Sequence, residues 1–323
     1  METCREPWAV VLAAGEGSRL RSLTTDAHGN STPKQFCSLD GGPSLLRLAL
    51  RRAERVARRS RVTTIVAAQH AIWWRGEIGL VPDSNVVVQP CNRGTAVGVL
   101  LPLLRILARD PGAHVVLLPS DHFVAEESVL ERALRDAIRE VSRRPARAVL
   151  LGVVPYEPDP GFGWIVPADH GRKGARQVLR FVEKPPAATA AELMSRGGVW
   201  NSFIMAGAGS TFLEMFEDRL PGVITRLREA LAPDAGAAST TGALARAYRR
   251  IGSFDFCRDV LEGSEDRLSV LPVPPCGWSD LGTPDRVARC VERIPRTSWS
   301  SPRAGGRSSL AQAAVAMRPC STP

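Results

Sequence analysis

The feature that most constrains this chain is residues 9–19, A-V-V-L-A-A-G-E-G-S-R, where an apolar run gives way abruptly to glycine. The run has the composition of a buried strand, and the segment after it is too small to pack a core. Gly15 and Gly17 allow positive φ and close approach of backbone N–H groups, which an anionic phosphate requires. Arg19 adds a fixed fork of donors, and Lys34 adds a mobile point charge. The stretch therefore predicts a strand that ends in a polyphosphate-binding loop.

Two other nucleotide loops and an ordinary tight turn compete with this interpretation. A dinucleotide-binding fingerprint needs a third small residue where this chain has Leu20, and no strand ending in a ribose-binding carboxylate follows. A P-loop needs Gly-Lys-Ser/Thr after the glycines, and none is present. These two classes are excluded, whereas the tight turn stays open on the loop alone.

Hydrophobic periodicity predicts the fold class. Apolar runs at residues 9–12, 62–68, 86–88, 115–118 and 148–153 alternate with helical spacing over 45–59, 95–109 and 128–143. This alternation is typical of a parallel sheet covered by helices on both faces. After residue 156 the pattern changes to two antiparallel strands, near 164–165 and 178–183, and a last strand is expected over 268–273. We expect an α/β fold with a doubly wound, mainly parallel sheet and an antiparallel insertion.

The same pattern predicts the domain organisation. One domain would cover residues 1–294, with a first half over 8–155 and a second half over 156–294. Residues 295–323 are rich in Ser, Arg, Gly, Pro and Ala, and we expect a disordered tail there.

Polar residues follow the predicted strands at the point where each strand ends. Gly15, Gln89 and Asp121 all come directly after apolar runs. Since ligands of open α/β sheets bind outside the carboxyl ends of the strands, these residues should meet. Asp121 could instead be a helix N-cap. A carboxylate that faces a polyphosphate needs a cation between them, so the functional interpretation requires Mg²⁺ at Asp121.

Three further polar positions stand out in the second half. Thr283 is a better cap than Asp280 for the final helix, which would leave Asp280 free for a second metal contact. Glu183 and Lys184 end a predicted strand. Asn201 interrupts the apolar run V-W-N-S-F-I, and a buried Asn needs partners, either backbone or ligand hydroxyls; both alternatives stay open.

Composition limits the partners and the compartment. The formal charge is +9, and only three of the 42 basic residues are lysines. The arginines alternate with acids at helical spacing, which is typical of a solvated helix face, so we expect no nucleic-acid partner. No apolar run reaches the length of a membrane span, and the seven cysteines contain no C-x-x-C pair. We expect a cytoplasmic protein with reduced thiols and no membrane partner; whether it forms a homodimer stays open.

Seven motifs occur in one order: L-A-A-G-E-G-S-R-L, T-P-K-Q-F, Q-P-C-N-R-G-T-A, L-P-S-D-H, F-V-E-K-P, W-N-S-F and W-S-D-L-G. This set resembles the sugar nucleotidyltransferases, most closely their mannose-1-phosphate guanylyltransferase branch, over roughly residues 8–294. The resemblance implies a Rossmann-like nucleotidyltransferase fold, with a nucleotide-binding half followed by a sugar-phosphate half. It also implies transfer of a nucleotidyl group from a nucleoside triphosphate, here GTP, to a hexose 1-phosphate, here mannose 1-phosphate, with release of pyrophosphate.

The resemblance also implies a role for each matching residue. Catalytic roles fall on Arg19, Lys34, Asp121 and Lys184, and Mg²⁺ ligands on Asp121 and Asp280. Sugar-phosphate contacts fall on Gly163, Glu183, Lys184 and Asn201. Nucleotide contacts fall on Leu12, Ala13, Ala14, Gly15, Gly17, Arg19, Lys34, Gln89, Gly94 and Thr95.

The chain departs from the family pattern in two places. Residues 26–31 lengthen the loop before P-K-Q-F, and Ser22 replaces a common Pro. Q-P-C-N-R-G-T-A lacks the usual Asn before its Thr, so the base stays open. A glucose-1-phosphate nucleotidyltransferase using another triphosphate, and a non-catalytic binder of sugar nucleotides, remain as alternatives. The fused isomerase domain of some relatives is not seen, so we expect a monofunctional form.

Overall fold

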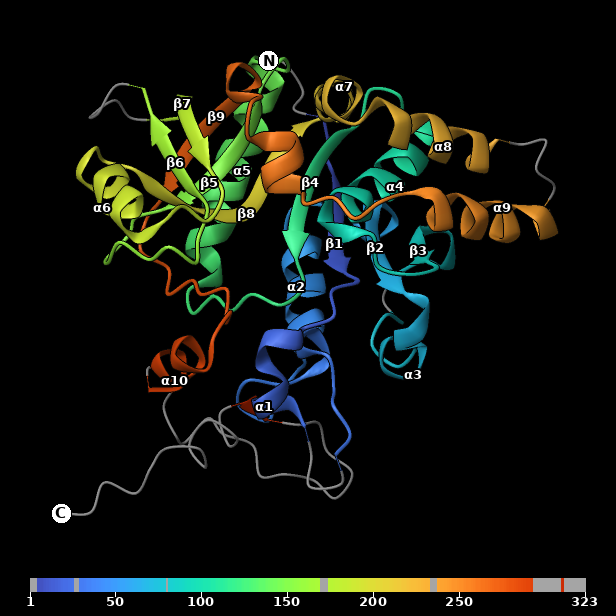
Figure 1. The fold of residues 1–323 in the computed structure, drawn as a ribbon, viewed down its shortest axis with the longest axis horizontal. Helices are drawn as coiled ribbons and strands as arrows, with labels where there is room; N and C mark the ends of the chain where they lie inside the picture. The colour runs from blue at the N-terminus through green and yellow to red at the C-terminus, as the bar shows by residue number, and fades with distance from the viewer. Residues whose placement is uncertain are drawn as a thin grey trace.

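A computed structural model describes residues 5–25, 29–79, 81–168, 174–232, 237–292 and 309–310 (Figure 1). Its strands form one nine-stranded sheet in the order β3-β2-β1-β4-β8-β5-β9-β7-β6. The strands are β1 (Trp8–Ala13), β2 (Val62–Ala67), β3 (Val86–Gln89), β4 (His114–Pro119), β5 (Ala148–Val153), β6 (Trp164–Pro167), β7 (Arg176–Val182), β8 (Val199–Ala208) and β9 (Leu268–Val273).

The first half of the sheet is parallel, as predicted. β1 pairs in parallel with β2 and β4, β2 with β3, and β5 with β9. β8 runs antiparallel between β4 and β5, and the pairings β6–β7, β6–β8 and β7–β9 are also antiparallel. The antiparallel insertion is therefore confirmed, but the sheet as a whole is mixed rather than mainly parallel. A central strand buried on both faces is apolar in either direction, so its direction cannot be read from its composition.

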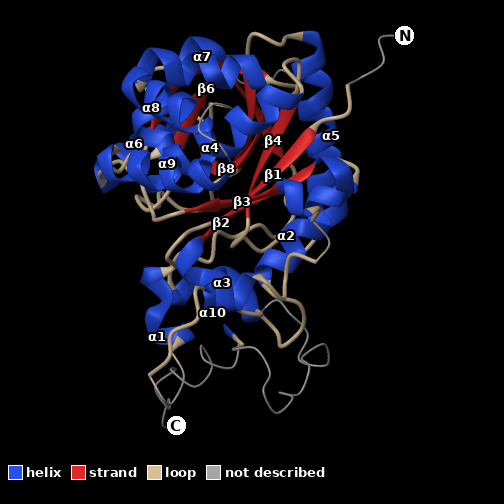
Figure 2. Cartoon of the chain, turned by 90° about the vertical axis from the view of Figure 1, so that its right-hand side faces the viewer, coloured by secondary structure: helices blue, strands red, loops and turns tan. Residues whose placement is uncertain are grey.

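Helices cover both faces of the sheet (Figure 2). The α-helices are α1 (Arg21–Thr24), α2 (Leu45–Glu54), α3 (Ala71–Trp74), α4 (Gly94–Arg109), α5 (Glu127–Arg143), α6 (Ala187–Ser195), α7 (Gly209–Arg219), α8 (Pro221–Leu231), α9 (Ala237–Arg250) and α10 (Pro284–Glu292). As predicted for a strand buried on both sides, successive residues of β1 enter different cores. Val10 belongs to the core with Leu100 of α4, and Val11 to the core with Leu46 of α2.

Local signals in the sequence explain several element boundaries. Ser44 caps α2, since its Oγ accepts from Arg47 N at 3.1 Å. Trp73 lies on the short α3, and its ring packs against Phe36 in a stacked arrangement with ring centroids 6.1 Å apart. Among the described helices, none combines the length and apolar character needed to cross a membrane.

Two segments singled out by the sequence lie partly outside the described residues. Residues 26–28 of the lengthened loop lie outside the described residues. The base of this loop closes through a β-bridge between Thr25 and Ser31. Most of residues 295–323 is also outside the description. Ser309 and Leu310 are described, however, and Leu310 is buried with its N–H donating to Ser38 O at 2.9 Å. At these two residues the structure differs from the disordered tail we expected.

Candidate active site

A cavity of about 440 Å³ lies at the carboxyl ends of β1, β3 and β4, where the polar strand ends were expected to meet. It is lined by residues from both halves of the chain, so the fold brings together motifs that lie far apart in sequence. The predicted site residues that line it are Leu12, Ala14, Gly15, Gly17, Arg19, Gln89, Gly94, Thr95, Asp121, Glu183 and Lys184.

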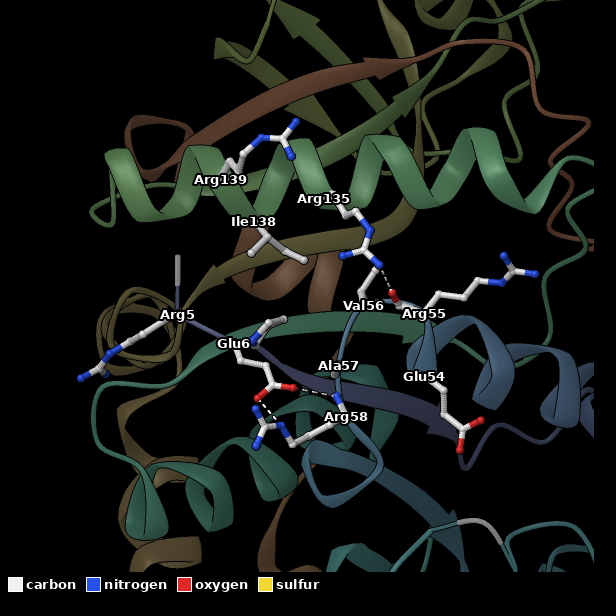
Figure 3. A pocket seen from close by; sticks show the side chains of 11 residues that line it. Arg5, Glu6, Glu54, Arg55, Val56, Ala57, Arg58, Arg135, Ile138 and Arg139 are labelled. Atoms are coloured by element: carbon white, nitrogen blue, oxygen red, sulfur yellow. Dashed lines mark hydrogen bonds and ion pairs between the residues drawn. The ribbon is translucent and has the colours of Figure 1, made fainter. Parts of the chain in front are cut away.

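A second hollow, of about 500 Å³, lies near the residues that precede β1 (Figure 3). Its arginines are already engaged within the chain: Arg58 pairs with Glu6 at 2.5 Å, and Arg135 donates to Arg55 O. None of its lining residues belongs to the predicted site. Although this hollow is slightly larger, the predicted site residues line the first cavity. We therefore take the first cavity as the candidate site and call it the active cavity.

The glycine-rich loop is held by the P-K-Q-F segment. Gly17 has a φ of 64°, and an added Cβ would lie 2.8 Å from Lys34 N, so the chain itself requires glycine there. Among the described residues, an added Cβ on Gly15 would meet nothing within 4 Å, which leaves open space beside the cavity. Gln35 Nε2 donates to Gly15 O at 2.9 Å and to Ala13 O at 3.2 Å. Gln35 thus fixes the loop, whereas Ala13 is buried in β1 and does not line the cavity.

The loop after β3 is clamped by a distant segment that we did not predict. Gly94 has a φ of 81°, and an added Cβ would lie 2.1 Å from Phe254 O. Ala96 N donates to Phe254 O at 3.0 Å, and Phe256 N donates to Thr95 Oγ1 at 2.7 Å. The first half of the chain is therefore tied to the second half directly at the cavity.

Gln89 has an unsatisfied acceptor at the cavity wall. The residue is 1% exposed, and its Oε1 has no hydrogen-bond partner in the described part of the chain. A buried carbonyl oxygen without a partner is costly unless a ligand supplies a donor. Its placement in the cavity lining fits a contact with an N–H group of a bound base.

Lys34 is bound to Asp121 rather than exposed in the cavity. Its Nζ lies 3.0 Å from Asp121 Oδ2 and also donates to Asp280 O, and the residue is 4% exposed. Burial alone would raise the pKa of Asp121, but the charge of Lys34 and its hydrogen bond lower it, and the net direction is downward. Asp121 is therefore an ionised carboxylate that lines the cavity.

His122 connects Asp121 to the W-S-D-L-G motif. Trp278 Nε1 donates to His122 Nδ1 at 3.3 Å, and His122 Nε2 lies 3.7 Å from Asp121 Oδ1. Burial lowers the pKa of His122 to about 4, so the ring is neutral near pH 7. Since Nδ1 is the acceptor, the proton sits on Nε2, on the side of Asp121. The sequence did not single out this contact.

Asp280 is not free, contrary to expectation. Thr283 does cap α10, because its Oγ1 accepts from Arg286 N at 3.3 Å. However, both carboxylate oxygens of Asp280 accept from Arg286 Nη1, at 2.9 and 2.8 Å, and the same guanidinium contacts Asp159 at 2.5 Å. The expectation that the Thr283 cap leaves Asp280 unengaged is therefore wrong, because Arg286 lies on the first turn of the same helix.

The two predicted metal ligands differ in how well they fit an ion. Asp121 is ionised and lines the cavity, and a carboxylate facing phosphate is the kind of ligand that a divalent cation takes. The Asp280 carboxylate is occupied by Arg286 and does not line the cavity in this arrangement. A cation shared by the two carboxylates stays a prediction.

The predicted sugar-phosphate residues lie close together. An added Cβ on Gly163 would lie 2.6 Å from Glu183 Oε2, and Gly163 O accepts from Asn201 N at 2.8 Å. Lys184 Nζ pairs with Glu183 Oε1 at 2.6 Å, and its side chain is 45% exposed. Burial raises the pKa of Glu183, although Lys184 opposes this effect. Glu183 and Lys184 line the cavity, whereas Gly163 and Asn201 contact this pair or its neighbours without lining the cavity.

Asn201 has partners within the chain, which decides between the two alternatives left open. Its Oδ1 accepts from Phe203 N at 3.0 Å, and its Nδ2 lies 3.3 Å from Cys257 Sγ. Ligand hydroxyls are therefore not needed to satisfy it. Cys257 also lies near Glu183 and Asp255: one potential metal-ligand atom of each lies within 4.8 Å of the others.

Comparisons with solved structures agree with this architecture. A structure described as mannose-1-phosphate geranyltransferase from Thermus thermophilus superposes with a TM-score of 0.75, at 26% identity, over 90% of this chain and 81% of that one. A UDP-glucose pyrophosphorylase from Acinetobacter baumanii, at 14% identity and a TM-score of 0.55, covers 88% of this chain and 91% of its own, and shows the fold alone.

Curated relatives match at similar identity. Mannose-1-phosphate guanylyltransferase 2 of Escherichia coli O157:H7 is 30% identical over 297 residues, 85% of this chain and 58% of that protein. Xanthan biosynthesis protein XanB of Xanthomonas campestris pv. campestris (strain B100) is 28% identical, over 85% of this chain and 57% of its own length. This chain thus spans little more than half the length of these relatives. A sequence profile described as nucleotidyl transferase matches residues 8–295, and the chain belongs to that family.

Proposed function

We propose that this protein transfers a nucleotidyl group from a nucleoside triphosphate to a hexose 1-phosphate and releases pyrophosphate, with GTP and mannose 1-phosphate as its substrates. One observation carries the proposal: a single cavity joins the glycine-rich loop and Asp121 to Glu183 and Lys184. A nucleotide and a second phosphorylated molecule would therefore meet inside it.

Contacts on the nucleotide side support a bound triphosphate. Gly15 leaves open space at the loop, and Arg19 lines the same cavity as a bidentate phosphate donor. The unpartnered Gln89 Oε1 supports a base that donates an N–H group, which every common base can do. The choice of GTP rests on the guanylyltransferase names of the relatives.

Charge on the sugar-phosphate side supports a second anion. Lys184 keeps nearly half of its side chain exposed at the cavity, and Glu183 beside it can accept hydrogen bonds from sugar hydroxyls. The choice of mannose 1-phosphate again rests on the names of the relatives. A glucose 1-phosphate enzyme with another triphosphate would use the same phosphate contacts, so it remains the second candidate.

In the proposed reaction, an oxygen of the sugar phosphate attacks the α-phosphorus in line, and pyrophosphate leaves. Both substrates are polyanions, so catalysis consists mainly of positioning and of neutralising charge, without a covalent protein nucleophile. Magnesium bound at Asp121 would supply positive charge to the phosphates. Arg19 would hold the departing phosphates and Lys184 the sugar phosphate.

Lys34 has a different place in this scheme from the one the sequence indicated. Because its ammonium is buried against Asp121 and the Asp280 carbonyl, it would position Asp121 and keep it ionised. A direct contact between Lys34 and pyrophosphate would require this pair to open.

Pyrophosphate release tests the proposal directly. The purified chain is incubated with Mg²⁺, mannose 1-phosphate or glucose 1-phosphate, and each of the four common nucleoside triphosphates. We expect release only when both substrates are present, and fastest with GTP and mannose 1-phosphate. Faster release with another pair would contradict the substrate assignment. Binding of a sugar nucleotide without release by any pair would favour the non-catalytic alternative.

A further inference from the structure

Phe203 is an exception within an otherwise buried central strand. Every other residue of β8 is buried, as expected for a strand enclosed by β4 and β5. Phe203 is half-buried, and it lines the active cavity. Its φ of 60° lies in the left-handed region, which bulky residues rarely adopt.

A bulge in β8 directs Phe203 away from the sheet. Leu150 pairs with Met205, but Gly152 pairs with Asn201, so a two-residue step on β5 faces a four-residue step on β8. Polar side chains complete the hydrogen bonds that this irregularity leaves open. Asn201 Oδ1 accepts from Phe203 N at 3.0 Å, and Ser202 Oγ accepts from the next backbone N–H at 3.1 Å. Bulges of this kind redirect side chains beside functional sites.

The strained backbone would suit glycine, yet the chain carries an aromatic ring there. Core packing uses only part of the ring: one side packs on the core, with Phe256 as its aromatic neighbour at a centroid distance of 6.0 Å. The rest of the ring is exposed and lines the cavity. Strained backbone clusters at ligand-binding sites, so an outlier at a cavity wall supports a hypothesis of function. The exposed part of the ring can contact a ligand inside the cavity.

We propose that Phe203 packs against the apolar C–H face of the hexose and selects the sugar. This inference rests on the proposed function. The ring belongs to the sugar side of the cavity because the N–H of Phe203 donates to Asn201 Oδ1 at 3.0 Å. Asn201 in turn contacts Cys257, which lies near Glu183. A hexose has hydroxyls at its edge and C–H groups on its faces. Glu183 and Lys184 would take the hydroxyls and the phosphate, and Phe203 would cover one face.

Two substitutions separate the ring from the backbone strain. Phe203→Leu keeps an apolar side chain but removes the aromatic face, and Phe203→Gly removes both ring and strain. We expect Phe203→Leu to raise KM for mannose 1-phosphate about tenfold, while KM for the nucleotide changes less than about twofold. Phe203→Gly should weaken sugar binding further but keep the midpoint of thermal unfolding within about 3 °C, because relieved strain offsets lost packing. Tyr156→Leu removes an exposed aromatic ring outside the cavity and should change neither constant.

Saturation-transfer NMR with mannose 1-phosphate alone makes the test independent of turnover. When the aromatic protons of the protein are saturated, the saturation should pass to the sugar C–H protons in the wild type. This transfer should be weaker in Phe203→Leu. If the wild type releases no pyrophosphate with any pair, the proposed function fails, but the NMR result still decides whether Phe203 contacts the sugar. Unchanged transfer in Phe203→Leu, a rise in KM for the nucleotide alone, or a large loss of stability in Phe203→Gly would overturn the proposal.

Discussion

Replacing Gly15 by Ala probes the ligand-facing side of the glycine-rich loop. An added Cβ at Gly15 meets no heavy atom within 4 Å, and the residue has no left-handed φ. The folded chain should therefore accept the methyl group without strain. Because Ala has fewer unfolded conformations than Gly, the free energy of unfolding should stay level or rise by about 0.4–1 kcal/mol. In a chain of this size that corresponds to a rise of about 0.6–1.5 °C in Tm.

Nucleotide binding should respond in the opposite direction. The methyl group would occupy space where the loop backbone approaches the phosphates, and one such group in a tight site costs about 1–3 kcal/mol. We expect KM for the nucleoside triphosphate to rise tenfold or more, while KM for the hexose 1-phosphate stays near its wild-type value. Initial rates of pyrophosphate release measure both constants, and differential scanning fluorimetry gives Tm.

Gly222→Ala is the matched control for this substitution. Gly222 lies in α8, away from the active cavity, and an added Cβ there also meets nothing within 4 Å. It should raise stability slightly and leave both constants unchanged. A Gly15→Ala protein with a wild-type KM for the nucleotide, or with Tm lowered by many degrees, would refute the assignment of the open space to ligand phosphates.

Three further substitutions test how the site is held. Gly94→Ala should lower Tm severely or prevent folding, because the new Cβ would lie 2.1 Å from the backbone oxygen of Phe254. A thermal melt like that of the wild type would contradict this close contact between Gly94 and Phe254. Arg286→Gln should lower the free energy of unfolding, measured by chemical denaturation, by about 3–5 kcal/mol, because it leaves two half-buried carboxylates without their partner. Arg289→Gln on the same helix should lower it by at most about 1 kcal/mol. Equal losses would show that the buried ion pairs stabilise the protein no more than the exposed one does. His70 is buried edge-on against Phe36 of the P-K-Q-F segment, with ring centroids 6.0 Å apart, and burial lowers its pKa. Between pH 7 and 5 the unfolded chain therefore binds a proton that the folded chain does not, and Tm should fall less on acidification in His70→Gln than in the wild type. Parallel pH profiles would argue against this.

Strand positions and nearly half of the cavity lining could be predicted because they depend on short-range patterns. β5 and β9 begin and end at the predicted residues, since a buried strand is a continuous apolar run. The residues after β1, β3 and β4 converge because parallel strands end at one edge of the sheet.

Contacts between distant segments left no comparable signal. Phe254 holds the loop at Gly94 through backbone atoms, which a residue of any type could supply. The two residues are also roughly 160 positions apart in the sequence. Arg286 is one of many arginines, so nothing in the sequence marked it as the partner of Asp280. The positive φ of Phe203 depends on the bulge in β8, which its apolar composition does not indicate.

The proposed reaction requires that the ionised Asp121 face both substrates in the active cavity. Its most direct test is the rate of pyrophosphate release by Asp121→Asn, with GTP and mannose 1-phosphate at saturation and Tm recorded alongside. We predict a loss of about 10²–10³ in kcat, the usual effect of removing one preorganised charge contact, with Tm still showing a folded protein. Release at the wild-type rate by the folded variant would remove Asp121 from the reaction and contradict the account.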